Sequence, residues 1–235
     1  MPEGRWRARS NSPESCADIG IIALGSHRER HGILPEDTDA KLASYVALQA
    51  SLRTGAKFLG VIFSSHELPG IKTGEHHPLK QVLKEMEKRL KEAKKILGIK
   101  GVVIVNAHGG NSPLRERIGK LEKKVGVRLL WNSTLVKGPH AGTEEFSMAK
   151  VLSMVDSSKL SEHMDFEKHP EVGFVGLPEA LQRYEWAREL AREVKEKGVK
   201  ADVRLGKGLL EKAVEEIARL TQELARELGK REARF

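Results

Sequence analysis

The chain has 235 residues, of which 39% are hydrophobic, and this is enough for the core of one ordinary domain. Its single cysteine, Cys16, excludes a disulfide framework and a multi-cysteine zinc site, and no run of about 18 apolar residues could cross a membrane. The formal net charge of +8 is compatible with nucleic acid, a membrane surface or a phosphorylated small molecule as a partner.

The basic residues lie mostly in segments such as KEMEKRLKEAKK, where glutamate and lysine alternate at helical spacing. This pattern predicts solvated helix faces, and an aromatic content of 5% leaves little material for stacking nucleic-acid bases. We therefore expect neither a nucleic-acid nor a membrane partner. The N-terminus has no apolar signal region, so we expect a cytoplasmic protein. We also expect an N-terminal extension at residues 1–18 and a single domain at residues 19–235.

Strand-like and helix-like segments alternate from residue 19 onward. The apolar run at residues 19–24 predicts a buried strand, and apolar residues at three- and four-residue steps predict a helix over 39–54 that ends near Gly55. A second strand at 57–63 precedes a helix that Pro78 opens and Gly98 ends.

The third predicted strand, residues 101–105, leads into a helix that runs to about Lys124, with Asn111 or Ser112 as its cap and Pro113 in its first turn. A fourth strand is predicted at 127–131, and further helices are predicted at 143–155, 178–197 and 206–229. This alternation of strands and helices indicates a three-layer α/β/α fold with a mainly parallel sheet. Sites in such folds form beyond the carboxyl ends of the strands.

Metal-capable side chains follow each of the predicted strands. Glu29 and His31 are one residue apart, so an extended segment places both side chains on the same face, and Asp39 lies eight residues further on. Asp39 is either a ligand or a helix cap, a role that Asp37 or Thr38 could also fill.

The next strands contribute further candidates. Glu67 and His76 follow the second strand, and His108 leaves the third strand into two glycines that allow a close approach to a ligand. Two imidazoles with two carboxylates suit zinc, ferrous iron or manganese, and a cation held in this way favours hydrolysis.

A second group of polar side chains follows the fourth strand. His140 and Glu145 can donate or accept a proton beside a metal site, although Glu145 can also favour the positive end of a helix dipole. His76 lines a pocket or caps the helix that begins at Pro78. Arg28 and Lys72, with Lys137 as a third candidate by location, can bind an anionic group of a substrate.

Three segments, ERHGILPEDTD, NAHGGN and HAGTEE, resemble the signature of the creatininase family of amide-cleaving metalloenzymes. They occur in the order of the family and extend the resemblance over residues 19 to about 150. The resemblance implies a creatininase-like fold, a homo-oligomer of at least two chains, and metal ligation by Glu29, His31, Asp39 and His108. The turn before Asp39 is one residue shorter than is usual in the family, so Asp37 remains an alternative ligand. Gly110 stands where creatininase carries a glutamate ligand.

Within the family, segments such as TGAKFLGVIFSSHELPGI are most similar to the archaeal formamidopyrimidine-ribonucleotide deformylases. This resemblance implies removal of formate from a phosphorylated formylaminopyrimidine in riboflavin and deazaflavin coenzyme synthesis. It also implies Fe(II) as the cation, and the ligand types leave Zn or Mn as alternatives. By their location, His76, Arg28 and Lys72 are candidates for substrate binding. Two other functions stay open, another creatininase-like amidohydrolase and a non-catalytic basic protein that binds nucleotides or RNA.

Overall fold

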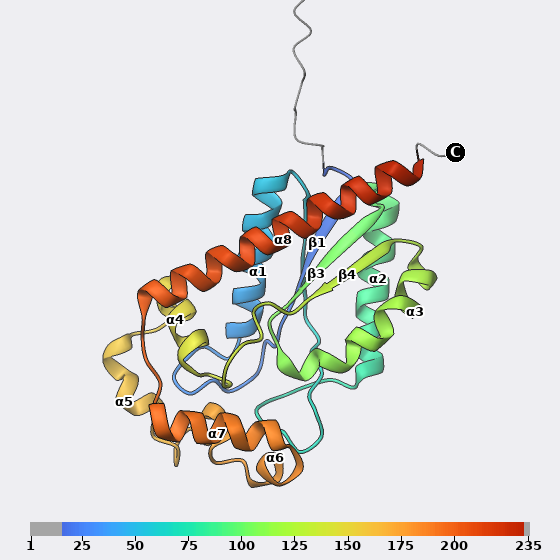
Figure 1. Ribbon diagram of the computed structural model, residues 1–235. Helices are drawn as coiled ribbons and strands as arrows, with labels where there is room; N and C mark the ends of the chain where they lie inside the picture. The colour runs from blue at the N-terminus through green and yellow to red at the C-terminus, as the bar shows by residue number, and fades with distance from the viewer. Residues whose placement is uncertain (1–15, 233–235) are drawn as a thin grey trace, which may run out of the picture.

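The computed structural model describes residues 16–232, with side chains through residue 230, so most of the predicted extension at residues 1–18 lies outside the described part. The described residues form a four-stranded sheet in the order β2-β1-β3-β4 (Figure 1). All neighbouring strands are parallel, and the strands are β1 Ile19–Leu24, β2 Lys57–Ile62, β3 Gly101–Asn106 and β4 Arg128–Asn132. The predicted mainly parallel sheet is therefore confirmed.

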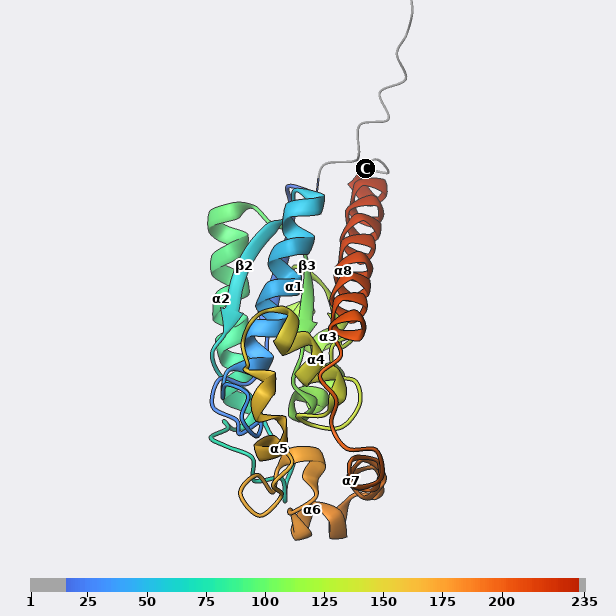
Figure 2. The same cartoon turned by 90° about the vertical axis from the view of Figure 1, so that its left-hand side faces the viewer.

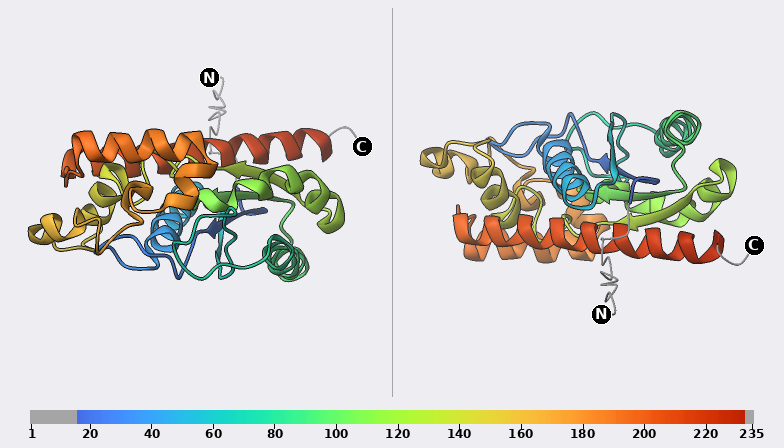
Figure 3. Two further views of the ribbon diagram at one scale, coloured as in Figure 1. Left: turned by 90° about the horizontal axis from the view of Figure 1, so that it is seen from below. Right: turned by 90° about the horizontal axis from the view of Figure 1, so that it is seen from above.

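Helices cover both faces of this sheet (Figures 2 and 3). Alternate strand residues point to opposite faces, so Ile21 of β1 packs with one helix layer and Ile22 packs with the other. The first layer contains α1 (Thr38–Thr54) and α8 (Val203–Glu232), and the second contains α2 (Leu79–Leu97) and α3 (Ile118–Val125). This arrangement confirms the three-layer α/β/α prediction, and it explains why β1 and β3 are apolar along almost their whole length.

The helix predicted after β3 differs from the structure at its beginning. Residues Gly109–Arg117 form a 3-10 helix, and α3 begins only at Ile118. The prediction that Asn111 or Ser112 caps this helix is wrong. The Asn111 side chain instead accepts a hydrogen bond from the His66 backbone N–H at 2.9 Å and donates to the Asn106 side chain at 3.1 Å. Asn111 therefore joins the segments that follow β2 and β3.

The segment at residues 143–197 lies at the carboxyl ends of the strands (Figure 1). It contains α4 (Thr143–Val151), α5 (Leu160–His163), a short turn at Val172–Phe174, α6 (Pro178–Arg183) and α7 (Glu185–Lys197). The helix predicted at 178–197 is divided because Tyr184 is extended, with φ −121° and ψ 123°, and its hydroxyl donates to the Pro69 carbonyl. Within residues 16–232 no helix is both long and apolar enough to cross a membrane.

Candidate metal centre

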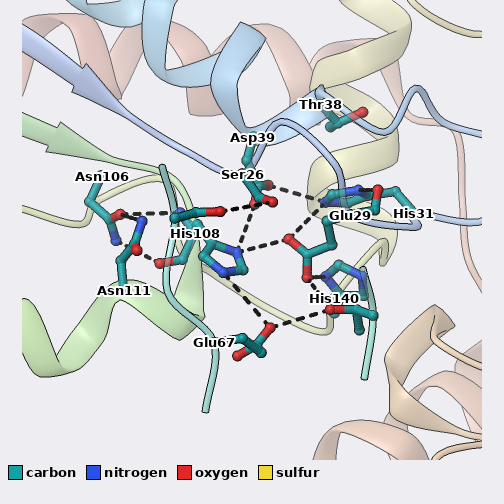
Figure 4. Close-up of polar contacts among 12 residues, drawn as sticks. Ser26, Glu29, His31, Thr38, Asp39, Glu67, Asn106, His108, Asn111 and His140 are labelled. Carbon is teal, nitrogen blue, oxygen red and sulfur yellow. Dashed lines mark hydrogen bonds and ion pairs between the residues drawn. The ribbon is translucent and has the colours of Figure 1, made fainter. Parts of the chain in front are cut away.

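Four of the predicted site residues meet at the carboxyl ends of the strands (Figure 4). Glu29 and His31 follow β1, Asp39 lies in the first turn of α1, and His108 follows β3. Each of the four is at most 3% exposed. Four buried polar side chains from three chain segments therefore form one cluster, although ionisable groups are costly to bury without partners.

Within this cluster, two carboxylates face two imidazoles at contact distance. His108 Nδ1 lies 2.8 Å from Glu29 Oε2 and 3.0 Å from Asp39 Oδ2. His31 Nε2 lies 3.2 Å from Asp39 Oδ1 and 3.9 Å from Glu29 Oε2. Asp39 therefore lies between the two imidazoles, and Glu29 contacts both of them.

The other nitrogen of each imidazole donates to a backbone carbonyl. His31 Nδ1–H donates to the Glu29 carbonyl at 2.8 Å, and His108 Nε2–H donates to the His66 carbonyl at 2.9 Å. His140 Nε2–H donates in the same way to the Arg30 carbonyl at 2.8 Å. Because a carbonyl oxygen can only accept, each of these nitrogens carries the proton and the opposite nitrogen faces the carboxylates. This is the usual arrangement around a metal-ligating histidine.

The donor set fits a divalent cation. Glu29 Oε2 is buried and accepts no well-directed hydrogen bond within the described part of the chain, although His108 Nδ1 is near. Burial alone would lower the pKa of His31, but the adjacent Asp39 carboxylate raises it to about 10. Burial also opposes the charge on His108, yet Glu29 raises the pKa of His108 well above its ordinary value. The two carboxylates thus attract positive charge, which a divalent cation can supply in place of two protons.

The structure places the side chains of Asp37 and Asp39 in different surroundings. Asp39 is buried between His31 and His108, whereas the Asp37 side chain is 39% exposed and pairs with Lys41 at 2.7 Å. Neither carboxylate caps α1, since no side chain makes a capping hydrogen bond at its N-terminus. The shortened turn therefore still delivers Asp39 to the cluster.

His140 and Glu145 lie beside the cluster, as the sequence predicted. His140 Nδ1 is 3.7 Å from Glu29 Oε1, and its ring stacks on Phe174 with centroids 5.3 Å apart. Glu145, in the first turn of α4, accepts a hydrogen bond from the Ala141 N–H at 2.8 Å. Burial, reinforced by the Asp39 carboxylate, raises the pKa of Glu145 to about 8. Glu145 can therefore hold a proton near neutral pH.

Glu67 and His76 extend the cluster on the side of β2. Glu67 Oε2 lies 3.7 Å from His108 Nε2 and 4.0 Å from His76 Nε2, and the His76 ring stacks on the His108 ring. Burial raises the pKa of Glu67 to about 7. No motif singles out Glu67 in the sequence, and its position after β2 was the one signal that pointed to it.

A cavity of about 280 Å³ opens onto these groups. Glu29, Asp39, Glu67, His108, His140 and Glu145 line its polar side. The apolar part of its lining consists of Leu68, Ile71, Val136, Phe174, Trp186 and Leu190. An enclosed polar cluster beside an apolar wall is typical of a small-molecule site.

Of the basic candidates for substrate binding, Lys137 lines this cavity, whereas Arg28 and Lys72 do not. Arg28 pairs with Glu75 at 2.8 Å, and Lys72 pairs with Glu179 at 2.7 Å. These largely exposed ion pairs hold both side chains at a separate, shallow depression. The structure therefore does not bring Arg28 and Lys72 to the buried carboxylates. The His76 ring stacks on the His108 ring, and His76 is not among the residues that line the cavity.

His163 is a buried histidine that the sequence did not single out. Its Nε2–H donates to the Ala141 carbonyl at 2.8 Å, and its Nδ1 accepts a hydrogen bond from the Ile33 N–H at 3.2 Å. His163 therefore joins the segment after β1 to the segment before α4. Burial lowers the pKa of His163 to about 4, which keeps the ring neutral.

This pKa predicts a pH-dependent stability. Between pH 6.5 and pH 4 the unfolded chain protonates His163 while the folded chain does not, so stability is complete above this window and falls as the pH falls through it. Relative to His163→Gln, the wild type should lose about 2 kcal/mol of unfolding free energy between pH 7 and pH 5. Urea denaturation of both metal-free proteins at the two pH values measures this difference. If the difference in unfolding free energy between wild type and His163→Gln is the same at pH 7 and pH 5, His163 is not a neutral, buried side chain.

Comparison with known proteins places this chain in a family. The family profile described as creatinine amidohydrolase matches residues 5–221. A Methanobrevibacter ruminantium protein is 46% identical over 220 residues, covering 92% of this chain and 94% of the relative. A Methanothermus fervidus protein is 43% identical over 202 residues, covering 85% of this chain and 81% of the relative. Both bear the name 2-amino-5-formylamino-6-ribosylaminopyrimidin-4(3H)-one 5'-monophosphate deformylase.

Solved structures of the same family share the fold. A mutant creatininase complexed with creatine has a TM-score of 0.64 and 17% identity, covering 89% of this chain and 93% of that chain. A putative creatinine amidohydrolase from Bacteroides fragilis has a TM-score of 0.60 and 20% identity, covering 88% of this chain and 90% of that chain. With the profile matching almost the entire sequence, the chain belongs to the creatininase family.

Proposed function

We propose that this chain is a metal-dependent hydrolase that removes formate from 2-amino-5-formylamino-6-(5-phosphoribosylamino)pyrimidin-4(3H)-one and leaves the 2,5-diamino product. The observation that carries this proposal is its 40–46% identity, over 85–92% of the chain, to relatives named as that deformylase. The buried cluster supports it, because a hydrolase of amides needs groups that activate water and move protons. The reaction would belong to riboflavin and deazaflavin coenzyme synthesis.

We propose Glu29, His31, Asp39 and His108 as ligands of the cation, with Fe(II) as the metal and Zn or Mn as alternatives. The orphaned Glu29 oxygen and the imidazole nitrogens turned toward the carboxylates support this set. Creatininase structures with the same fold are described as Zn-Zn and Mn forms. When bound, a divalent cation lowers the pKa of a coordinated water and polarises the formyl oxygen.

His140 and Glu145 would then manage the protons of the reaction. Water adds to the formyl carbon, the C–N bond breaks, and the departing amine needs a proton. Glu145 is suited to supply that proton because it lines the cavity and has a pKa of about 8. Burial lowers the pKa of His140, and its Nε2–H is donated to the Arg30 carbonyl, so the unprotonated Nδ1, which faces Glu29, is suited to accept a proton.

Replacing Glu145 with glutamine is expected to lower kcat by about 100- to 1,000-fold, because proton transfer to the amine loses its donor. Cation content should stay at the wild-type level. Glu144→Gln is the matched control, since it removes a neighbouring carboxylate from the same first turn of α4 and changes the helix dipole interaction equally. The kcat values of wild type, Glu145→Gln and Glu144→Gln decide whether Glu145 transfers a proton or only interacts with the helix dipole. Equal losses in both variants would contradict a proton-transfer role for Glu145.

The cavity can accept the pyrimidine against its apolar wall. Lys137 is the one lysine or arginine among its lining residues in the described part of the chain, and we propose that it contacts the substrate phosphate. Arg28 and Lys72 would first have to leave their ion pairs with Glu75 and Glu179. Binding roles for Arg28, Lys72 and His76 stay predictions.

Formate release tests this function directly. Protein purified without oxygen and loaded with Fe(II) is incubated with the formylaminopyrimidine nucleotide and, separately, with creatinine. We expect formate from the first and no turnover of the second. A folded, metal-loaded protein that releases no formate would refute the proposal. Turnover of creatinine or of another small amide would instead favour a different creatininase-like amidohydrolase.

We also propose that the chain assembles into at least a dimer. Several large apolar side chains are exposed, among them Leu52 at 70%, Phe63 at 64% and Ile96 at 76%. Contact with another chain would bury such exposed apolar side chains. Light scattering coupled to size-exclusion chromatography measures the mass of the assembly.

A further inference from the structure

The positive charge of the chain is concentrated on one face of the sheet. The segment at residues 79–125, which contains α2, β3, the 3-10 helix and α3, has thirteen lysine and arginine residues and five acidic residues. Its excess of positive charge equals the formal net charge of the whole chain, which is +8. The helices α2 and α3 lie side by side in the same layer (Figure 1), so this charge gathers on one surface.

A groove of about 730 Å³ lies between α2 and α3. Its lining includes seven basic side chains and one acidic side chain, Glu87. The rim on α2 consists of Lys80, Lys84, Lys88 and Lys91, and the opposite rim consists of Arg117, Lys120 and Lys124. The lysines of α2 recur at steps of four, four and three residues, so they follow one face of the helix for about 16 Å.

Most of these cations have no ion-pair partner. Within the part of the chain that the structure describes, Lys91 and Lys124 pair with Glu87 at 2.7 and 2.6 Å, and the other five form no ion pair. Neither α2 nor α3 has an acidic residue in its first turn, where the helix dipole is itself positive. Lys80 and Lys120 therefore add positive charge where it weakens the helices. An anionic partner would offset this repulsion.

Two leucines form the base of the groove between the rims. Leu83 and Leu121 line the groove, and both are less exposed than the basic side chains around them. The lysine side chains add their own apolar stems to this surface. A complementary partner therefore needs an apolar ridge that reaches the leucines, and acidic groups on both sides of that ridge.

We propose that the groove between α2 and α3 binds an acidic amphipathic helix of a partner protein, with apolar side chains on Leu83 and Leu121 and carboxylates on the two rims. The α2 rim of about 16 Å matches about three turns of such a helix. Helices dock in grooves through apolar anchors at this spacing. The inference goes beyond the proposed function, since the groove and the cavity at the metal centre share no lining residue.

Other polyanions match the groove less well. The lining residues include no aromatic side chain on which a nucleic-acid base could stack, and a phosphate backbone has no apolar ridge to cover the leucines. A flat membrane surface would meet the exposed lysines before it reached the less exposed leucines. The combination of apolar base and basic rims therefore favours a helix with the opposite pattern.

Fluorescence anisotropy tests the proposal with the full chain and a labelled synthetic peptide. The peptide is a helix of about four turns with one stripe of leucine and glutamate on both sides of it. We expect saturable binding that weakens as the salt concentration rises. The Lys84→Glu/Lys120→Glu variant, with one reversed charge on each rim, should bind at least about 30-fold more weakly. Glu87→Gln, which frees Lys91 and Lys124, should bind more tightly.

Lys207→Glu/Lys212→Glu is the matched control, because it makes the same change of charge on α8, in the opposite layer. This variant should bind the peptide like the wild type. A peptide of the same composition, with its leucines spread around the helix, should bind at least about 10-fold more weakly because it cannot bury them together. Equal affinity for the two peptides, or equal losses in the two charge variants, would overturn the proposal.

Competition and mass measurements identify other occupants of the groove. RNA, as single strands and as duplexes, and vesicles that contain phosphatidylserine are added to the complex with the labelled peptide. Light scattering compares the assembly of wild type and Lys84→Glu/Lys120→Glu, which should have the same mass. Circular dichroism checks folding, and Lys84→Ala/Lys120→Ala replaces the charge reversal if that variant unfolds. RNA or vesicles that bind the groove more tightly than the peptide, or a smaller assembly in the variant, would overturn the proposal.

Discussion

Replacing His108 with alanine is expected to remove tight cation binding and to lower kcat/KM for formate release by at least about 1,000-fold. The expected loss exceeds the 10- to 100-fold effect typical of groups that only support a metal ligand. His108 Nδ1 contacts both Glu29 and Asp39, so its loss removes the nearer of the two imidazoles that these buried carboxylates share. Elemental analysis of protein purified without oxygen measures the cation, and formate release measures the activity.

His27→Ala is the control for this experiment. His27 lies in the same GSHRERHG segment as His31, but its ring stacks on Phe63 outside the cluster. The His27→Ala variant should keep the cation content of the wild type. His31→Ala should behave like His108→Ala, because His31 Nε2 faces Asp39 at 3.2 Å. Wild-type cation content and formate release in the His108 and His31 variants would refute the assigned ligand set.

Replacing Gly32 with alanine is expected to lower the free energy of unfolding by about 3 to 5 kcal/mol, from backbone strain and overpacking together. Gly32 has a φ of 64°, and a Cβ atom there would lie 2.2 Å from His163 Nδ1. The same atom would lie 3.0 Å from Val172. The His163 ring cannot retreat without losing its hydrogen bonds to Ile33 and Ala141. Urea denaturation of the metal-free proteins measures the change.

Gly208→Ala is the opposite control. Gly208 lies in α8, and a Cβ atom there would meet nothing within 4 Å. Alanine should stabilise this helix by up to about 1 kcal/mol, because glycine is the poorer helix former. If Gly32→Ala unfolds at the same urea concentration as the wild type, the close packing of Gly32 against His163 is not required for stability.

The sequence alone determined the layered fold and most of its element boundaries. Strands buried on both faces must be apolar throughout, which made β1 and β3 recognisable as short runs. Glycines with positive φ end α1 at Gly55 and α2 at Gly98, where the pattern predicted. These signals are local, so they can be interpreted without knowledge of the packing.

The same local reasoning predicted which polar residues gather at one edge of the sheet. Parallel strands place their carboxyl ends together, and Glu29, His31, Asp39 and His108 do lie in one buried cluster. The roles of these residues in binding a cation stay predictions. The interruption at Tyr184 and the 3-10 helix after β3 were missed, because each depends on contacts with a distant segment.

Only the tertiary structure decided which further side chains reach this cluster. Glu67 meets His108 across 41 positions of sequence, and Gly110 leaves the room for it. His163 joins two loops that are far apart in the chain. The directions of Arg28 and Lys72 follow from ion pairs with Glu75 and Glu179. Side-chain direction in loops depends on contacts between segments rather than on a local period, so no sequence pattern could determine these placements.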